Sequence, residues 1–566
     1  MRPVATLKAA ALGAALFASG AALAQTPTQT LSGVISANRT LDAAQVYLID
    51  GEVYVDNNVT LTIPAGTLLK GKRTPTTGNG NASVLVVQRG GQLVANGTAA
   101  APIIFTAETD NVADAFDLNE NQRGLWGGVV ILGNATANNG TGTIEGIPAT
   151  ARTTYGCGDA GFPCDDNDNS GTLRYVSVRH AGFTLGANAE INGVTFGGVG
   201  RGTTVEYVEV FANSDDSFEF FGGTVNARYL VGVFGGDDDL DWDVGYRGRI
   251  QFVLSVKDDA GDVGRCIEGD GALTPFTPTP LSSPVVSNLT CIGSGVTGTA
   301  PAGSDAGGPS MTLRDNTGGF IYNSVFTAVQ NPRGGLDLEA PADANVSTRV
   351  NFDQGELDVR NNIFFDFSAG NTPAGIVNGS DTALETEIAA RNTIVSPGLR
   401  AISRQQNRGL DPRPTSDAAA ASGANFSYAP IQGSIFTPVA FRGAFAPGQP
   451  AWAAGWTALD RNAYFSAQVA VEAEAGPLAA AGFRIAATPN PATSGRAALT
   501  VEVPETTDAR IAVYDVLGRE VAVVAERTLA AGTQTFAIGR MLPAGVYVAR
   551  LTTAQGMTAV QFTVVR

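Results

Sequence analysis

Short apolar runs separated by turn residues dominate the hydrophobic pattern of the chain. Apolar β-branched and aromatic residues alternate with polar ones in runs such as LTIPAGTLLKG from 61, GTTVEYVEV from 202 and GRIQFVLSV from 248. Gly, Asn and Asp bound the runs, and these residues supply turns with positive φ. Because no comparable stretch shows a sustained helical period, the pattern predicts a nearly all-β chain.

The spacing of the runs predicts a right-handed parallel β-helix for residues 25–440. Tyr207, Tyr229 and Gln251 hold equivalent places in successive runs that lie 22 residues apart, which is about one coil of such a solenoid. A β-sandwich would show more Asn-Gly or Asp-Gly hairpin turns than this sequence contains. Turn asparagines suited to the coils stand at Asn323, Asn362 and Asn392. We expect a continuous core that includes Val208, Val210, Phe252 and Leu254.

The two ends of this region carry different signals. Arg2 and Lys8 precede an apolar run that is followed by the small-residue site Ala22-Leu23-Ala24. This arrangement is typical of a secretory signal peptide, so we expect residues 1–24 to be removed during export. No later apolar stretch reaches the roughly 18 residues needed to cross a bilayer. Residues 441–483 are rich in Ala, Gly and Pro, and we expect a cap or a linker there.

Composition narrows the choice of partner and compartment. The chain has 36 Lys and Arg against 53 Asp and Glu, a balance that argues against nucleic acid or an anionic membrane as partner. Its four cysteines are an even number in an exported chain. The simplest pairing joins Cys157 with Cys164 and Cys266 with Cys291, although four cysteines allow three connectivities and a metal thiolate site is the alternative.

An acidic stretch, GGDDDLDWDVGY from 235, raises the question of how its carboxylates are neutralised. With coils of 22 residues, Asp215 would lie under Asp237 and Asp237 under Asp259, while Asp216 would lie under Asp238 and Glu219 under Asp241. Like charges stacked about 4.8 Å apart are destabilising unless something neutralises them. Hard oxygen ligands at this density suit Ca²⁺, and a solvated face and a catalytic cluster are the alternatives. The candidate metal ligands are Asp215, Asp216, Asp237, Asp238, Asp241 and Asp259.

Other candidate chemistry is weaker. The loop CDDNDNSG from 164 begins like a calcium loop but has Ser177 where the last ligand should stand, so we favour a turn into the next strand. His180, the only histidine, suits a hydrogen-bonded corner, and no catalytic residue is assigned. Possible bases near the acidic stretch are Arg247, Arg249 and Lys257. Aromatic residues that would either stack on sugars or fill the core are Trp126, Phe220, Phe221, Trp242 and Tyr246.

Two resemblances add to this picture. The succession TLTIPAGTLLKG, VANGTAAAPIIFTA, RGLWGGVVILGNA, NSGTLRYVSVRHAG and DDSFEFFGGTV closely resembles a family of exported bacterial parallel β-helix proteins of poorly defined function. The segments TPNPATSG, IAVYDVLGREV and LPAGVYVARL resemble the C-terminal sorting domain of type IX secretion cargo, over residues 484–566. The second resemblance implies recognition by the type IX machinery, a small immunoglobulin-like sandwich, and delivery to the cell surface or outside the cell.

We therefore expect a secreted or cell-surface β-helix with a structural, adhesive or glycan-binding role. Parallel β-helices also include enzymes that cleave polysaccharides, so a calcium-dependent polysaccharide lyase or another glycan-cleaving enzyme is the alternative.

Overall fold

The computed structural model describes residues 25–78, 82–183, 191–259, 264–295, 309–330, 334–339, 346–433, 435–466, 483–488, 492–493, 498–515, 520–538, 542, 545–553 and 556–565. The expected signal peptide, residues 1–24, lies outside the described residues. The chain divides into two compact units. The first contains the residues up to Val225 together with Phe234–Gly236, and the second contains Asn226–Val233 and Asp237–Arg566.

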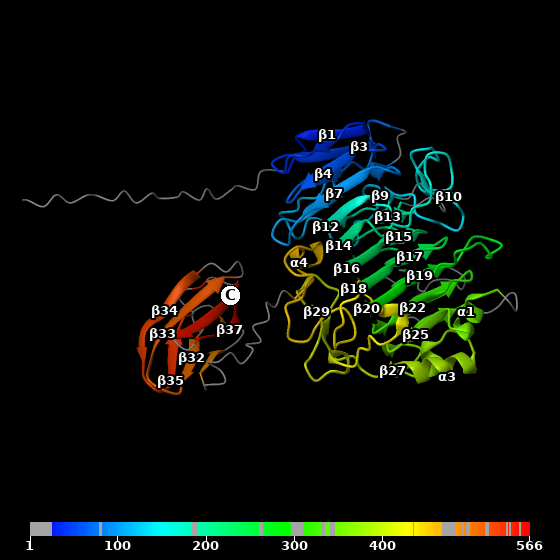
Figure 1. Ribbon diagram of the computed structural model, residues 1–566. Helices are drawn as coiled ribbons and strands as arrows, with labels where there is room; N and C mark the ends of the chain where they lie inside the picture. Colours follow the sequence, from blue (N-terminus) through cyan, green and yellow to red (C-terminus); the bar gives the residue numbers. More distant parts are fainter. Residues whose placement is uncertain are drawn as a thin grey trace, which may run out of the picture. The chain divides into compact units, whose positions relative to one another are not determined.

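The first unit is a stack of parallel strands, as Figure 1 shows from β1 down to β14. Its strands are β1 (Gln29–Ile35), β2 (Arg39–Thr40), β3 (Val46–Val55), β4 (Thr60–Pro64), β5 (Leu68–Gly71), β6 (Val84–Val87), β7 (Gln92–Asn96), β8 (Ile103–Ala107), β9 (Val129–Leu132), β12 (Gly171–Arg179), β13 (Val194–Gly197), β14 (Thr204–Phe211) and β15 (Phe218–Phe221). An antiparallel pair, β10 (Thr141–Thr143) and β11 (Thr154–Gly156), lies outside this ladder.

Apolar columns run through the interior of this unit. Val194 pairs with Val129 on one neighbouring strand and with Phe218 on the other, and all three side chains are buried. The next inward positions, Phe196 and Phe220, stack with ring centroids 5.2 Å apart. Such columns arise because parallel pairing without a register shift places equivalent residues one strand spacing apart.

The second unit contains a parallel ladder of the same kind. Its paired strands are β16 (Asn226–Val233), β17 (Leu240–Asp243), β18 (Arg249–Val256), β19 (Ile267–Asp270), β20 (Val285–Ile292), β21 (Met311–Arg314), β22 (Gly319–Tyr322), β23 (Val325–Val329), β24 (Leu336–Leu338), β25 (Leu357–Arg360), β26 (Ile363–Phe367) and β27 (Thr393–Ile394). Its interior column contains Leu240, Ile267, Met311 and Leu336, each fully buried. The ladder ends at β27, well before the expected boundary at 440.

A left-handed corner divides the long strands of each unit. In the first unit Tyr175 and Tyr207 have φ of 47° and 56°, and their rings stack 4.4 Å apart. In the second unit Tyr229 and Phe252 do the same, with φ of 59° and 63° and centroids 4.9 Å apart. Gln251 pairs with Arg228, so the predicted equivalence of Tyr229 with Gln251 is wrong by one residue.

A non-coil segment covers this corner in the second unit. It contains the antiparallel pair β28 (Leu399–Ile402) and β29 (Leu410–Pro414) and the short helices η1 (Ala419–Ala421), η2 (Ala429–Ile431) and α4 (Ala458–Arg461). Gln251 exchanges two hydrogen bonds of 2.8 Å with the backbone of Thr437, and the ring of Phe441 stacks on Phe252. The segment from 441 on also contacts the coils, since Ala444 N–H donates to Thr290 Oγ1 at 2.8 Å, while 467–482 lie outside the described residues.

Three helices interrupt the last coils, contrary to the expectation of a nearly pure β region. They are α1 (Thr348–Gln354), α2 (Pro373–Ile376) and α3 (Thr382–Arg391). The first four residues of the run IAARNTIVSP therefore belong to helix α3. Asp381 caps this helix, because its carboxylate accepts a hydrogen bond from Leu384 N–H at 2.9 Å. No helix among the described residues has both the length and the apolar character that crossing a membrane requires.

The C-terminal region has its own hydrophobic core. A three-stranded sheet contains β30 (Arg484–Thr488), β32 (Ala498–Val503) and β35 (Gly532–Ala537), and a five-stranded sheet contains β31 (Ala492–Thr493), β33 (Thr507–Asp515), β34 (Glu520–Leu529), β36 (Gly545–Thr553) and β37 (Gly556–Val565). Leu499 and Val501 from the first sheet share one buried cluster with Ile511 and Phe562 from the second. The immunoglobulin-like assignment of this region stays a prediction.

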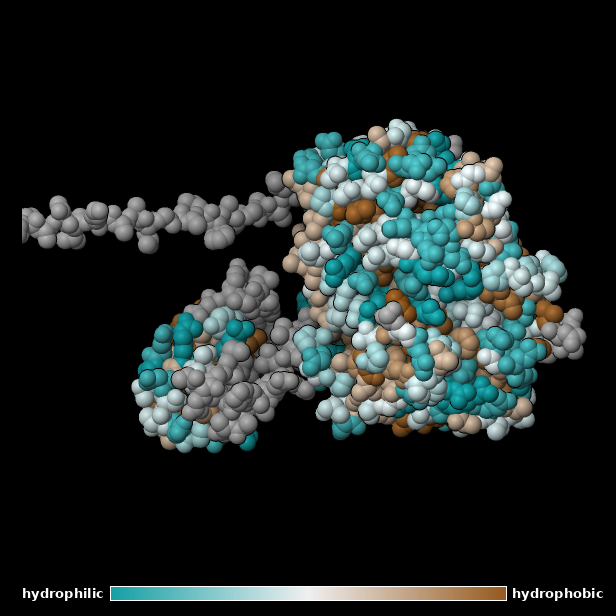
Figure 2. Space-filling view, viewed as in Figure 1, coloured by the Kyte–Doolittle hydropathy of each residue, from teal (hydrophilic) through white to brown (hydrophobic). Residues whose placement is uncertain are grey.

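Two disulfides link nearby parts of the chain. Cys157 is bonded to Cys164 and Cys266 to Cys291, which is the simplest pairing of the four. The face of the molecule seen in Figure 2 is largely hydrophilic, with apolar residues scattered in small groups.

A single glycine tests the interior stacking of the second unit. A Cβ built on Gly269 would lie 2.4 Å from Trp242 Cζ2 and 2.5 Å from Cε2, because the indole covers this position on the neighbouring strand. We expect Gly269→Ala to lower the free energy of unfolding by about 1–3 kcal/mol, measured by chemical denaturation. Trp242→Phe removes the clashing ring atoms. The double variant should therefore lose less free energy of unfolding than the sum of the losses in the two single variants. Equal stability of Gly269→Ala and wild type would contradict the close stacking.

Candidate functional site

Charged side chains gather on the outward side of the short strands of the second unit. Parallel pairing places Asp241 beside Glu268, and Glu268 beside Thr312. Two positions along, Asp270 lies beside Arg314. We call the acidic face the set Asp238, Asp241, Asp243, Arg265, Glu268, Asp270, Thr312 and Arg314.

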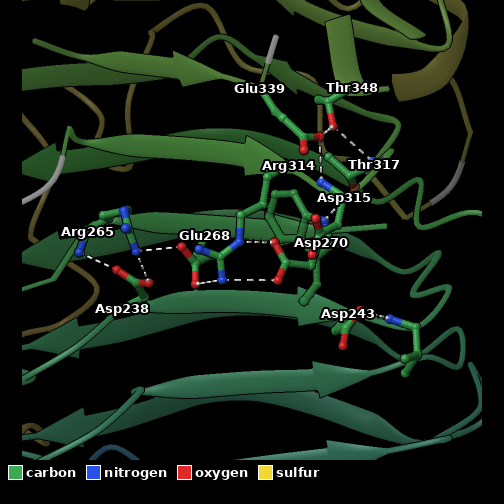
Figure 3. Close-up of polar contacts among 12 residues, drawn as sticks. Asp238, Asp243, Arg265, Glu268, Asp270, Arg314, Asp315, Thr317, Glu339 and Thr348 are labelled. Atoms are coloured by element: carbon green, nitrogen blue, oxygen red, sulfur yellow. Dashed lines mark hydrogen bonds and ion pairs between the residues drawn. The ribbon is translucent and has the colours of Figure 1, made fainter. Parts of the chain in front are cut away.

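A continuous series of ion pairs crosses the acidic face (Figure 3). Arg265 Nη1 lies 3.1 Å from Asp238 Oδ2 and also binds Glu268 Oε1. The other oxygen of Glu268 lies 3.0 Å from Arg314 Nη2, and Arg314 Nε lies 2.9 Å from Asp270 Oδ1. Arg265 is buried, whereas the side chains of Arg314 and Asp270 are 36% and 17% exposed. One end of the series is therefore deep and the other reaches the surface.

The two arginines do not neutralise the five carboxylates of the face. Burial raises the pKa of Glu268 to about 9, and burial raises the pKa of both Asp243 and Asp270 to about 6. Burial, together with the charges of Glu268 and its neighbours, raises the pKa of Asp241 well above its usual range. Asp241 Oδ1 is buried and accepts no hydrogen bond from any described residue. The face therefore holds excess negative charge that favours protonation or a bound cation.

The start of the acidic stretch is not a solvated tip. Asp238 and Asp239 are buried, and Asp239 accepts from Ser255 Oγ at 2.5 Å and lies 3.3 Å from Lys257 Nζ. Lys257 also donates to the backbone oxygen of Asp237. Specific partners neutralise these charges. Asp238 and Asp239 therefore do not form a simple solvated face.

One expected column is wrong. Gly264, not Asp259, lies against Asp237 in the next coil, because a Cβ on Gly264 would meet the backbone of Asp237 at 2.6 Å. Asp259 lies elsewhere, 3.7 Å from Arg404 Nη1, and accepts from Gln405 Nε2 at 3.1 Å. The coil between β17 and β19 is longer than 22 residues, since Leu240 pairs with Ile267.

The remaining predicted ligands belong to the first unit. Carboxylate oxygens of Asp215 and Asp216 lie within 4.8 Å of each other, and the same limit holds for Asp216 and Glu219. The expected columns from Asp215 and Asp216 to Asp237 and Asp238 join the two units and stay predictions, as does Ca²⁺ itself.

The sequence missed most of the acidic face. Its constant 22-residue spacing pointed away from Arg265, Glu268, Asp270 and Arg314. A usable signal was present, because LDWD, IEGD and MTLR share an alternation in which the first and third positions face the core. Aligning these three four-residue segments would have brought Glu268, Asp270 and Arg314 together with Asp241.

Most of the aromatic candidates fill the core and cannot serve as sugar platforms. Among them only Phe221 is partly exposed, and the fully buried ones are Trp126, Phe220, Trp242 and Tyr246. His180 is also buried at a left-handed corner, with Nδ1 2.6 Å from the backbone oxygen of Gln122. Burial lowers its pKa, which does not suit a proton carrier in contact with solvent.

The other candidates have structural partners. In the loop from 164, Ser170 donates to Asp168 at 3.0 Å and Asp166 accepts from Thr136 N–H at 3.0 Å, as expected for an ordered turn. Of the possible bases, Lys257 is buried in its ion pair and Arg249 is exposed at the start of β18.

Comparison with known families agrees with this architecture. Residues 33–409 match the model of the pectate-lyase-like β-helix domain, which covers more than half of the chain. The chain belongs to the pectate-lyase-like β-helix family. Residues 487–566 match the secretion system C-terminal sorting domain. A search of curated proteins gives no significant match.

The second match fixes where this β-helix protein acts. A C-terminal sorting domain of the type IX system marks the chain for export and implies recognition by that machinery. The protein is therefore located at the cell surface or outside the cell. Both resemblances seen in the sequence are confirmed.

The raised pKa values predict that stability falls as the pH rises. The carboxyls bind more protons in the folded than in the unfolded chain, so their contribution to stability is complete below pH 4. It is lost as the pH rises through about 6 for Asp243 and Asp270 and through about 9 for Glu268. In chelator, Asp241→Asn should raise the melting temperature at pH 8 by about 2–4 °C and leave it nearly unchanged at pH 4.5. Exposed Asp417 offers the matched control, Asp417→Asn. A lower melting temperature of Asp241→Asn at pH 8 would contradict this electrostatic account.

The sorting match predicts a separable export signal. Deleting residues 484–566 should leave a folded passenger in the periplasm, because the deleted sheets share a hydrophobic core of their own. Cell fractionation and protease protection measure the location, and circular dichroism of the purified passenger checks its fold. Surface delivery of the truncated chain would show that the signal lies elsewhere.

Proposed function

We propose that this exported β-helix protein binds glycans through the acidic face, in an adhesive or structural role at the cell surface. The observation that carries the proposal is the ion-pair series that ends at Arg314 and Asp270, both partly exposed. Sugar hydroxyls donate to carboxylates and accept from guanidinium groups. Because the ion pairs already hold these groups in place, binding loses little side-chain entropy.

The chemistry of the face favours a neutral, hydroxyl-rich glycan. Five carboxylates against two arginines would repel an acidic polysaccharide unless a cation intervened. The buried state of Trp126, Trp242 and Tyr246 supports recognition by hydrogen bonds more than by ring stacking. Partly exposed Asp243 extends the accessible end of the face.

Cleavage of a glycan is a second candidate, favoured by one observation. The pKa of Glu268 stands near 9 while those of Asp243 and Asp270 stand near 6, and separated carboxyl pKa values are typical of acid and base pairs in glycosidases. A lyase is less favoured, since its arginine base must lose a proton. The carboxylates of Asp270 and Glu268 raise the pKa of Arg314 further above its usual range, against the opposing effect of burial.

Binding is tested with the mature protein and a panel of neutral and acidic polysaccharides in affinity electrophoresis, followed by calorimetry on the best oligosaccharide. Asp270→Asn removes the charge and replaces one partly exposed acceptor oxygen with a donor, so it should weaken binding about tenfold, roughly the 1.4 kcal/mol of one charged hydrogen bond. Asp417→Asn, on the surface outside the face, should bind like wild type. Retained affinity of Asp270→Asn, or a panel without any ligand, would contradict binding at this face.

Assays for reducing ends and for unsaturated products on the same panel separate binding from cleavage. A binding protein should release neither product. New reducing ends that are lost in Glu268→Gln would establish the hydrolase instead.

A further inference from the structure

Four oxygen-bearing side chains lie at neighbouring positions at the start of strands β13 and β15 in the first unit. Thr195 and Glu219 are paired positions on the two strands. Just before them, Gly193 N–H donates to the backbone oxygen of Asp216 at 2.9 Å, which brings Asn192 beside Asp216. Carboxylate oxygens of Asp216 and Glu219 lie within 4.8 Å of each other. All four residues are at least nine-tenths buried.

Two of these buried oxygens have no partner among the described residues. They are Asn192 Oδ1 and Thr195 Oγ1, in side chains with relative exposures of 1% and 0%. The amide of Asn192 is correctly oriented, because its Nδ2 donates to Glu219 Oε2 and the flipped amide would direct its oxygen at a carboxylate. The unpartnered Asn192 Oδ1 therefore belongs to the same amide group whose nitrogen contacts Glu219.

Unpartnered buried oxygens beside two carboxylates indicate a positively charged occupant. Leaving one buried polar group without a partner costs about 1–3 kcal/mol, and two close carboxylates repel each other in addition. A water molecule could bond the neutral oxygens but would not offset the negative charge. A cation bound by all four groups removes both penalties at once.

We propose that Asn192, Thr195, Asp216 and Glu219 form a binding site for Ca²⁺. The donor set consists only of oxygens, from two carboxylates, an amide and a hydroxyl, and Ca²⁺ accepts such irregular sets with further positions left for water. Mg²⁺ demands stricter octahedral geometry and should bind more weakly. Asp215, whose carboxylate lies within 4.8 Å of that of Asp216, adds negative charge at the outer side.

This inference is independent of the proposed glycan binding, because it concerns other residues in the other unit. Only Asp215 and Asp216 were among the ligands expected from the sequence. Asn192 and Thr195 were not, since a single amide and a single hydroxyl carry no charge pattern that a sequence reveals.

The test uses the mature protein after treatment with EDTA, with Ca²⁺ alone as the probe in calorimetry and thermal melting. Ca²⁺ should bind and raise the melting temperature, since an ion bound only by the folded state stabilises it by mass action. Glu219→Gln should weaken Ca²⁺ binding about a hundredfold. Glu206→Gln is the matched control, because Glu206 lies on β14 in the same unit and pairs with Arg174 outside the site.

Thr195→Val separates metal binding from a purely structural role. The hydroxyl has no partner among the described residues without the ion, so the melting temperature in EDTA should be unchanged or higher in the variant. Its affinity for Ca²⁺ should nevertheless fall about tenfold. The proposal is overturned if millimolar Ca²⁺ neither binds nor shifts the melting temperature of wild type, or if Thr195→Val binds Ca²⁺ as tightly as wild type.

Discussion

Parallel stacking of coils is the constraint on which this structure depends. Each coil places its residues one strand spacing above their equivalents, so every choice of side chain is repeated along a column. Inward columns meet this constraint with apolar side chains, as in Leu240, Ile267 and Met311, or with a large ring above a glycine, as in Trp242 and Gly269. Outward columns carry charged side chains, and there the same repetition brings like charges close together, which is destabilising.

The repulsion between carboxylates of the acidic face is reduced in more than one way. Arginines are interleaved with carboxylates, so that Arg265 and Arg314 each bridge two acidic side chains. Where no described arginine forms an ion pair, as at Asp241, burial moves the pKa upward and favours the neutral acid. The stacking that builds the core thus also creates, on its outer side, a row of acids with unusual proton affinity.

The sequence predicts the kind of fold well because stacking leaves a periodic trace. Apolar alternation, turn glycines and recurrent aromatics identify the parallel coils, and the C-terminal motifs identify the sorting domain. Coil length is harder to predict, because loops of different size join strands that pair in the same parallel manner. The separation between paired residues changes from one coil to the next, since Leu230 pairs with Val253 whereas Leu254 pairs with Thr290. A register built from a single spacing therefore soon misplaces residues.

The candidate site depends on that register, which explains which residues were found. Asp238 and Asp241 were identified from the local density of carboxylates together with the assumed 22-residue spacing. Glu268 and Arg314 were missed, although each continues the apolar and polar alternation of LDWD, because the intervening loops differ in length. Asp259 was included because a fixed spacing placed it above Asp237, and it lies instead beside Arg404.

Neutral oxygens such as Thr195 Oγ1 mark the limit of sequence reasoning, because their significance comes from the absence of a partner among the residues that the structure describes. Each way of neutralising a stacked carboxylate also makes the fold respond to a different variable. Ion pairs with arginine respond to salt, protonated acids respond to pH, and a bound cation responds to its concentration. A protein exported from the cell meets all three variables outside buffered cytoplasm. Its outward columns are therefore where conditions outside the cell act on the stability of a core that is otherwise apolar.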